Sequence, residues 1–162
     1  GDEPIFNPKD LKKLVNYSLN NPKEIVSGYC NINQERMYND LNVPKVVLDK
    51  NKYLLYATRA AVPSNKKGNF VSAKRQICAY SFPSEVLKFF DKSKKKTPLE
   101  SVEDIEYLRF IENGLRIKCI EMSGTSLAVD NSFDLNLVSQ IINKNRNLYD
   151  WKKKIFRPKL GK

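Results

Sequence analysis

Residues Lys45–Ala57, KVVLDKNKYLLYA, decide the fold class of this 162-residue chain. Two apolar runs, 46–48 and 53–57, flank the polar segment 49–52. Apolar runs of this length around a short polar turn are typical of a β-hairpin. The middle of the chain is therefore predicted to form two antiparallel strands.

Two helix starts lie on either side of this hairpin. Asn7-Pro8-Lys9-Asp10 combines a capping residue, a proline in the first turn and an acidic side chain, and Asn20-Asn21-Pro22 ends the helix. Thr97-Pro98-Leu99-Glu100 is a capping box. Because apolar residues then recur up to Gly114, we expect one continuous helix here. That stripe consists of Leu99, Val102, Ile105, Leu108 and Ile111.

The remaining segments complete a mixed α/β pattern. Short apolar runs predict strands, and the segment that opens at Pro83 and the segment 132–143 are expected to be helical. Residues 31–42 are polar and read as a loop or a weak helix. The expected strands outside the hairpin are 25–30, 76–82, 115–122 and 127–129.

Two aspartates stand at the exits of strand-like stretches. Asp2 lies in Gly1-Asp2-Glu3-Pro4, and Asp130 follows Ala128-Val129. Ligands of open α/β sheets collect at the carboxyl ends of strands, and Mg²⁺ prefers a few carboxylates together with substrate phosphates. The pattern fits a shared magnesium site, and it fits equally well an ordinary turn at each position.

Composition narrows the function classes. The net charge is +11, but +7 of it lies in residues 141–162, which hold eight basic residues and one aspartate, so nucleic-acid binding is not the expected role. The chain has no histidine, which removes Ser-His and Cys-His nucleophile systems. Its three cysteines are widely spaced, which argues against a disulfide framework or a zinc site. No apolar run reaches the roughly 20 residues of a membrane span.

Single residues leave alternatives open at this stage. Arg59, just after the hairpin, fits either a bidentate ligand of a substrate carboxylate or a surface arginine. Tyr80, on an alternating strand, fits either the core or a binding site. Glu106 and Tyr107 fall off the apolar stripe of the predicted helix, so we expect them on its polar face, toward solvent or a substrate.

Six motif segments follow one another in a fixed order: Gly1–Pro4, Lys45–Asp49, Tyr56–Pro63, Gln76–Tyr80, Pro98–Arg109 and Ala128–Leu135. In this order they resemble the CMP-Kdo synthetases (3-deoxy-manno-octulosonate cytidylyltransferases) and, more broadly, the sugar-acid cytidylyltransferases. That family carries N-V-Q-G-D-E-P, K-V-V-x-D…Y-F-S-R-x-x-I-P, H-x-G-x-Y-x-Y-R, P-L-E-x-x-E-x-L-E-Q-L-R and G-V-D-T-P-E-D-L. The resemblance covers about residues 1–143.

The resemblance implies a Rossmann-like nucleotidyltransferase fold with a mixed sheet and an inserted β-hairpin and helix. In this family CTP and a sugar acid, most often Kdo, give the CMP-sugar and pyrophosphate with Mg²⁺. The implied metal ligands and catalytic residues are Asp2 and Asp130. Residues about 45–112 correspond to the dimerisation and sugar-binding region, so a cytoplasmic homodimer serving lipopolysaccharide or capsule synthesis is expected. The implied sugar-facing residues are Arg59, Gln76, Tyr80, Glu106 and Tyr107.

Departures from the family pattern concern the sugar side and the start of the chain. Gln76 stands where the family has histidine, and Glu106-Tyr107 replaces Glu-Gln, so a related acid sugar is an alternative to Kdo. The family's N-terminal strands and nucleotide loop have no counterpart in this sequence, so we expect the chain alone to be inactive. The alternative function is an inert dimerisation or scaffold module of the same fold, and the tail 144–162 extends past the pattern.

Overall fold

The computed structural model describes residues 4–92, 95–127, 129 and 132–144. These residues form two compact units. The larger unit, Phe6–Ser126, contains the whole β-sheet. The smaller unit combines residues 1–5 with the segment from Leu127 onward, and its described helix is α6 (Ser132–Lys144), which confirms the helix expected there.

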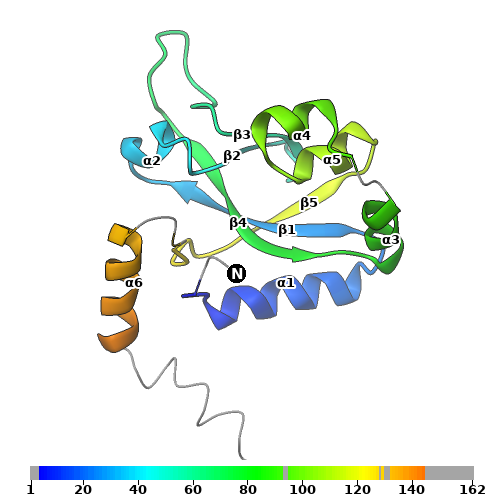
Figure 1. Ribbon diagram of the computed structural model, residues 1–162, viewed down its shortest axis with the longest axis horizontal. Coiled ribbons are helices and arrows are strands. Elements are labelled where there is room, and N and C mark those ends of the chain that lie inside the picture. The colour runs from blue at the N-terminus through cyan, green and yellow to red at the C-terminus, as the bar shows by residue number, and fades with distance from the viewer. Residues whose placement is uncertain (1–3, 93–94, 128, 130–131, 145–162) are drawn as a thin grey trace, which may run out of the picture. The chain divides into compact units, whose positions relative to one another are not determined.

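The sheet of the larger unit has five strands in the order β3-β2-β4-β1-β5 (Figure 1). The central strand β1 (Ile25–Ile32) runs antiparallel to β4 (Ala73–Ser81) and parallel to β5 (Ile117–Glu121). Strand β4 begins three residues before the expected start at Gln76. A sheet with both parallel and antiparallel neighbours confirms the predicted mixed α/β class.

The predicted hairpin forms β2 (Lys45–Leu48) and β3 (Leu54–Thr58), with Val46 opposite Ala57. The Asp49 carboxylate closes the turn, because Oδ1 accepts hydrogen bonds from the N–H of Asn51 and of Tyr53, each at 2.8 Å. The hairpin therefore owes its register to the polar turn as well as to its apolar strands.

One face of the sheet is covered by α1 (Pro8–Asn20), as the capping signal predicts. The Asn7 side chain accepts a hydrogen bond from the Lys9 N–H at 2.9 Å. Leu14 is the buried anchor of this helix and packs into a cluster on the sheet. That cluster contains Leu14, Val26, Cys30, Ile77, Ile120 and Met122.

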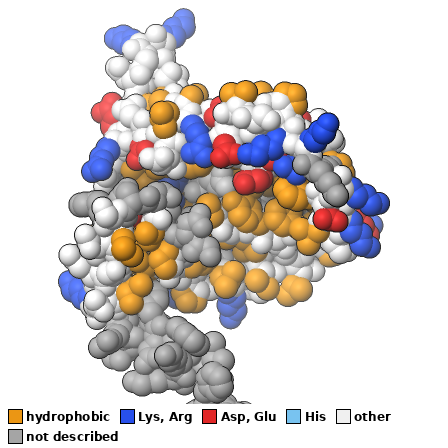
Figure 2. Space-filling view, viewed as in Figure 1, with side chains coloured by type: hydrophobic (Ala, Val, Ile, Leu, Met, Phe, Trp, Pro, Cys, Tyr) orange, Lys and Arg blue, Asp and Glu red, His pale blue; other side chains and the backbone are white. Residues whose placement is uncertain are grey.

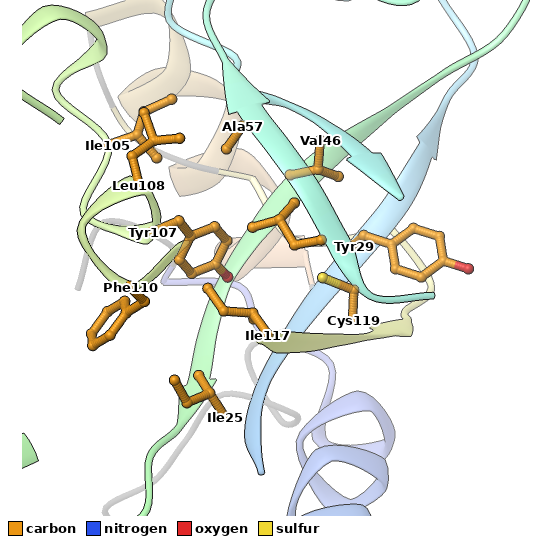
Figure 3. Close-up of a cluster of buried hydrophobic side chains, with 11 residues drawn as sticks. Ile25, Tyr29, Val46, Ala57, Ile105, Tyr107, Leu108, Phe110, Ile117 and Cys119 are labelled. Atoms are coloured by element: carbon orange, nitrogen blue, oxygen red, sulfur yellow. The ribbon is translucent and has the colours of Figure 1, made fainter. Parts of the chain in front are cut away.

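A second cluster lies where the hairpin, β5 and the segment after the capping box converge (Figure 3). The capping-box segment is not the single helix that the apolar stripe predicts. It forms α4 (Pro98–Glu103) and α5 (Tyr107–Glu112), separated by Asp104 in the left-handed region at φ 54°. The break turns Tyr107 inward, to 2% exposure, and leaves Val102 83% exposed. The predicted polar-face position of Tyr107 is therefore wrong.

Shorter elements complete the unit. The polar segment after β1 contains the short helix α2 (Glu35–Asn39), and α3 (Ser84–Lys92) follows Pro83 as predicted. The strand expected at 127–129 includes a position outside the described residues. Among the described helices, none combines the length and apolarity that a membrane crossing requires.

Candidate functional site

Three of the predicted sugar-facing residues meet in one cluster, to which β4 contributes Gln76 and Tyr80 and α5 contributes Tyr107. The Gln76 side-chain amide Nε2 donates to the Tyr80 hydroxyl at 2.6 Å. The rings of Tyr80 and Tyr107 meet edge to face, with centroids 5.3 Å apart. Gln76 and Tyr80 share one face of the strand because they are four residues apart. The edge-to-face contact between the Tyr80 and Tyr107 rings then positions Tyr107, the third residue of the cluster.

Two polar atoms of this cluster are buried without a hydrogen-bond partner in the part of the chain that the structure describes. They are Gln76 Oε1 and Tyr107 Oη, on side chains that are 7% and 2% exposed. Tyr80, at 38% exposure, links them to the surface. A buried polar atom left unpaired costs about 1–3 kcal/mol, so an unpaired acceptor beside an unpaired donor is a feature that a bound polar ligand would relieve.

Protonation keeps the two tyrosines as hydrogen-bond donors. Burial raises the pKa of Tyr107 well above its ordinary value of 10.0, and burial is also the main cause of the raised pKa of Tyr80. The charge of Glu106 adds to the rise of the Tyr80 pKa, and the Glu106 side chain itself is exposed, as its predicted polar-face position requires. The cluster thus offers a neutral donor and an amide acceptor, a pair that suits a polyhydroxylated ligand.

Arg59 lies in a different environment, at the exit of β3. Its guanidinium donates to three backbone carbonyl oxygens, those of Glu103 at 2.7 Å, Leu41 at 3.0 Å and Asp104 at 3.3 Å. These bonds tie the end of the hairpin to the corner between α4 and α5. The positive charge of Arg59 also interacts with the nearby carboxylates of Glu103 and Asp104, and it helps to lower the pKa of each.

Glu103 is a central residue of this corner that sequence reasoning missed. Its carboxylate accepts from Thr58 Oγ1 at 2.6 Å, the Arg59 N–H at 2.9 Å and Tyr56 Oη at 3.3 Å. Burial raises the pKa of Glu103, but these three donors outweigh it and hold the pKa below the ordinary 4.5. The available signal was its place as the second glutamate of Pro98–Glu103, the P-L-E-x-x-E motif.

A buried ion pair supports the same corner. Glu100 is fully buried, and its two oxygens accept from Arg109 Nε and a terminal guanidinium nitrogen, both at 2.6 Å. The hydrogen bonds from Arg109 are the main reason that the pKa of Glu100 is lowered. The guanidinium also stacks on the Phe90 ring, 4.1 Å from its centroid. This pair fixes α4 against α5 and is internally satisfied.

The two aspartates predicted as metal ligands, Asp2 and Asp130, lie outside the described residues. Among the described side chains, no group of three or more carboxylates and thiols is arranged to hold a metal ion. The described part of the chain therefore contributes the cluster around Gln76 and the corner around Glu103, and it leaves the predicted metal site untested.

Comparisons with known proteins give this arrangement its context. A family model described as cytidylyltransferase matches residues 1–117. Among similar proteins, the 3-deoxy-manno-octulosonate cytidylyltransferase of Fusobacterium nucleatum is 32% identical over 147 residues, with 90% of this chain and 59% of the relative covered. That of Chloroherpeton thalassium is 34% identical over 153 residues, with 89% and 60% covered.

A solved structure shares the fold. It is a CMP:2-keto-3-deoxy-manno-octonic acid synthetase complexed with CTP, which superposes with a TM-score of 0.79 at 22% identity, over 89% of this chain and 59% of that one. The chain thus spans about three-fifths of the length of the relatives it matches. The family match over residues 1–117 confirms the prediction made from the motif order: the chain belongs to the cytidylyltransferase family.

Proposed function

We propose that this chain is the sugar-acid-binding portion of a CMP-Kdo synthetase, an enzyme that transfers CMP from CTP to a sugar acid with release of pyrophosphate. Family membership supports the reaction class, and the relatives' names support Kdo as the sugar acid. The observation that carries the proposal is the pair of buried, unpaired polar atoms on Gln76 and Tyr107 beside the accessible Tyr80.

In this proposal each member of the cluster has a distinct role. Tyr107 Oη donates a hydrogen bond to an oxygen of the sugar acid, and Gln76 Oε1 accepts one from a sugar hydroxyl. Tyr80 holds the Gln76 amide in the orientation that turns its oxygen toward the ligand. Glu106 accepts from a further hydroxyl. Such a site discriminates strongly against sugars that lack these hydroxyls, because its buried polar groups would then stay unpaired.

Arg59 supplies the positive charge that attracts the sugar carboxylate. A guanidinium has five N–H donors, and backbone carbonyls engage Arg59 through Nε and both terminal nitrogens. The N–H donors that remain would engage the sugar carboxylate. Asp2 and Asp130 remain the proposed ligands of Mg²⁺, which would neutralise the phosphates of CTP when bound.

The remaining parts of the proposal concern assembly and context. We infer a homodimer through the region 45–112, supported by the exposed apolar side chains Leu55, Leu87 and Val102, at 56%, 51% and 83% exposure. Cytoplasmic synthesis of lipopolysaccharide or capsule precursors is the proposed setting. An inert scaffold of the same fold is the second candidate, and the same exposed apolar side chains of the region 45–112 are the observation that supports it.

A chimera tests the proposal. The part of the Fusobacterium nucleatum relative that has no counterpart in this chain is joined to it, and pyrophosphate release from CTP, Kdo and Mg²⁺ is measured. The chimera is expected to turn over, and this chain alone is expected to be inactive. A chimera that folds cooperatively and binds CTP without responding to Kdo or a related acid sugar would favour the scaffold. In the chimera, Tyr107→Phe is compared with the control Tyr38→Phe. Tyr38 is a buried tyrosine away from the cluster, and its hydroxyl donates to the Ala61 carbonyl.

A further inference from the structure

The three cysteines of the chain differ in exposure. Cys30 and Cys119 are buried, at 4% and 2% exposure, in the two apolar clusters of the sheet. Burial raises the pKa of Cys119 to about 12, which keeps its thiol protonated and unreactive. Cys78, in β4, is exposed. Figure 2 shows apolar side chains, among which it counts cysteine and tyrosine, on the surface over β4. A dissolved thiol reagent therefore reaches Cys78 in preference to the two buried cysteines.

Cys78 lies within the candidate site. Alternation along β4 places Gln76, Cys78 and Tyr80 on one face, whereas Ile77 faces the cluster under α1. The side-chain amide of Gln76 donates to the Tyr80 hydroxyl at 2.6 Å, so this hydrogen bond joins the residues on either side of Cys78. A group attached to the Cys78 sulfur would stand between the two partners of that bond.

The strand is irregular at the same point. Ile77 lies opposite Gly28 of β1, whereas Tyr80 already lies opposite Ser27. The residues at positions 78 and 79 thus form a β-bulge in β4. Bulges occur next to binding and active sites, where they change the direction of a side chain. This bulge places the Cys78 thiol beside the cluster and away from the regular ladder.

Cys78 interacts with both tyrosines of the cluster. Burial is the largest cause of the raised pKa of Tyr80, and the charge of Cys78 and a hydrogen bond with its side chain add to it. Burial is likewise the main cause of the raised pKa of Tyr107, and the charge of Cys78 is one of the smaller causes. The thiol therefore lies close to the two hydroxyl groups, in agreement with its place on the strand.

A second observation indicates a ligand at this position. Gln76 Oε1 and Tyr107 Oη are buried without a partner among the described residues, on side chains that are 7% and 2% exposed. A ligand that pairs with them covers the thiol, and a group on the thiol takes the place of the ligand. The H-x-G-x-Y pattern quoted above has glycine where this chain has Cys78, so the thiol is a feature of this chain.

We propose that Cys78 is a reversible thiol-modification site within the sugar-acid site, and that a mixed disulfide on its sulfur excludes the sugar acid. The co-reactant is a low-molecular-weight disulfide. The Cys78 thiolate attacks one of its sulfurs, so that a new S–S bond forms as the old one breaks, and the other half leaves as a thiolate that takes up a proton. An added thiol reverses the exchange. The identity of the excluded ligand rests on the proposed function, whereas the modification itself does not.

Modification of the folded chain by glutathione disulfide tests the site. Peptide mass spectrometry is expected to find Cys78 modified at least tenfold faster than Cys30 and Cys119, and the same treatment in urea gives the reference rates for accessible thiols. The adduct is expected to shift the NMR signals of the Gln76 side-chain amide, and dithiothreitol is expected to restore them. Equal modification of the three cysteines in the folded chain would overturn the proposal, and so would unchanged Gln76 signals in the modified chain.

Kinetics of the chimera described above test the exclusion. Modification of Cys78 is expected to raise the KM for Kdo at least tenfold, and saturating Kdo is expected to slow the modification at least tenfold. The matched control is Val71→Cys in a Cys78→Ser background, which moves the accessible thiol to a 70% exposed position before the start of β4. Modification of the control is expected to leave its KM unchanged and to proceed at the same rate with and without Kdo.

The outcomes separate this proposal from the proposed function. A chimera that turns over with Kdo at the same KM before and after modification of Cys78 would overturn the exclusion, and so would equal increases of KM for thiols at positions 78 and 71. A chimera that binds CTP and ignores Kdo, while the adduct on Cys78 still shifts the Gln76 signals, would support the modification site and count against the proposed function alone.

Discussion

The corner between α4 and α5 and the Gln76–Tyr80–Tyr107 cluster are neighbouring regions of the fold. They differ in whether their buried polar side chains have hydrogen-bond partners. At the corner, Glu100 and Glu103 receive donors from β3, from the residue that follows it and from α5, and each carboxylate is paired. In the cluster, an amide oxygen and a phenol remain buried without partners in the described chain. Paired buried polar groups stabilise a fold, whereas unpaired ones cost stability, so those of the cluster are candidates for binding a ligand.

The largest loss of stability is expected from breaking the buried Glu100–Arg109 ion pair at the corner. Arg109→Met removes the partner of the fully buried Glu100 and should cost about 3–5 kcal/mol in the free energy of unfolding, measured by urea denaturation. Lys96→Ala, which removes the surface partner of Asp104, is the control and should leave the free energy of unfolding nearly unchanged. Similar losses for both variants would contradict the structural role assigned to the buried pair.

A smaller loss is expected at the hub of the corner. Glu103→Ala leaves the Thr58 hydroxyl and the Arg59 N–H without their acceptor, and should cost about 2–3 kcal/mol in the same assay. Because α5 begins four residues later, at Tyr107, the variant should also broaden the NMR signals of the Tyr107 ring. A stable variant with unchanged Tyr107 signals would show that Glu103 does not hold the corner.

Acid should weaken the corner in a defined direction. The pKa values of Glu100 and Glu103 are lowered in the folded protein, so their stabilisation is complete above the ordinary glutamate pKa of 4.5 and is lost as the pH falls through the folded values. Urea midpoints measured down the pH scale should therefore decline below about pH 4.5. The urea midpoint of Glu103→Gln should decline less steeply over the same pH range. An unchanged slope would show that Glu103 does not contribute to the loss of stability in acid.

The smallest change in stability is expected at Tyr107, whose buried hydroxyl has no partner among the described residues. Tyr107→Phe removes a buried donor that has no acceptor, so the free energy of unfolding should stay level or rise by about 1 kcal/mol. Tyr38→Phe removes a hydroxyl that donates to the Ala61 carbonyl at 2.8 Å, and should lose about 1 kcal/mol. Opposite signs for two buried Tyr→Phe changes would be hard to explain unless the two hydroxyls differ as described.

Local signals predicted much of the fold. The polar turn 49–52 predicted the hairpin, and Asn7-Pro8 predicted the start of α1. The break at Asp104 was missed, because the apolar stripe that follows the capping box continues through it. The left-handed turn is held by contacts distant in sequence, chiefly the Arg59 guanidinium, which donates to the carbonyls of Glu103 and of Asp104 itself.

The candidate site, like the fold, could be predicted from local sequence signals only in part. The four-residue spacing places Gln76 and Tyr80 on one strand face, but the contact with Tyr107 joins β4 to α5 and depends on the missed break. Motif order identified all five sugar-facing candidates, because a family pattern carries long-range information that periodicity lacks. It did not distinguish Arg59, which is tied to the corner, from the three residues that meet in the cluster.

The most direct test of the central claim, that the unpaired cluster binds the sugar acid, is steady-state kinetics of Tyr107→Phe in the chimera. The account predicts a KM for Kdo at least tenfold higher, with the KM for CTP unchanged and the protein no less stable. A KM for Kdo equal to that of the unmodified chimera would contradict it, and the buried hydroxyl of Tyr107 would then have no part in binding the sugar acid.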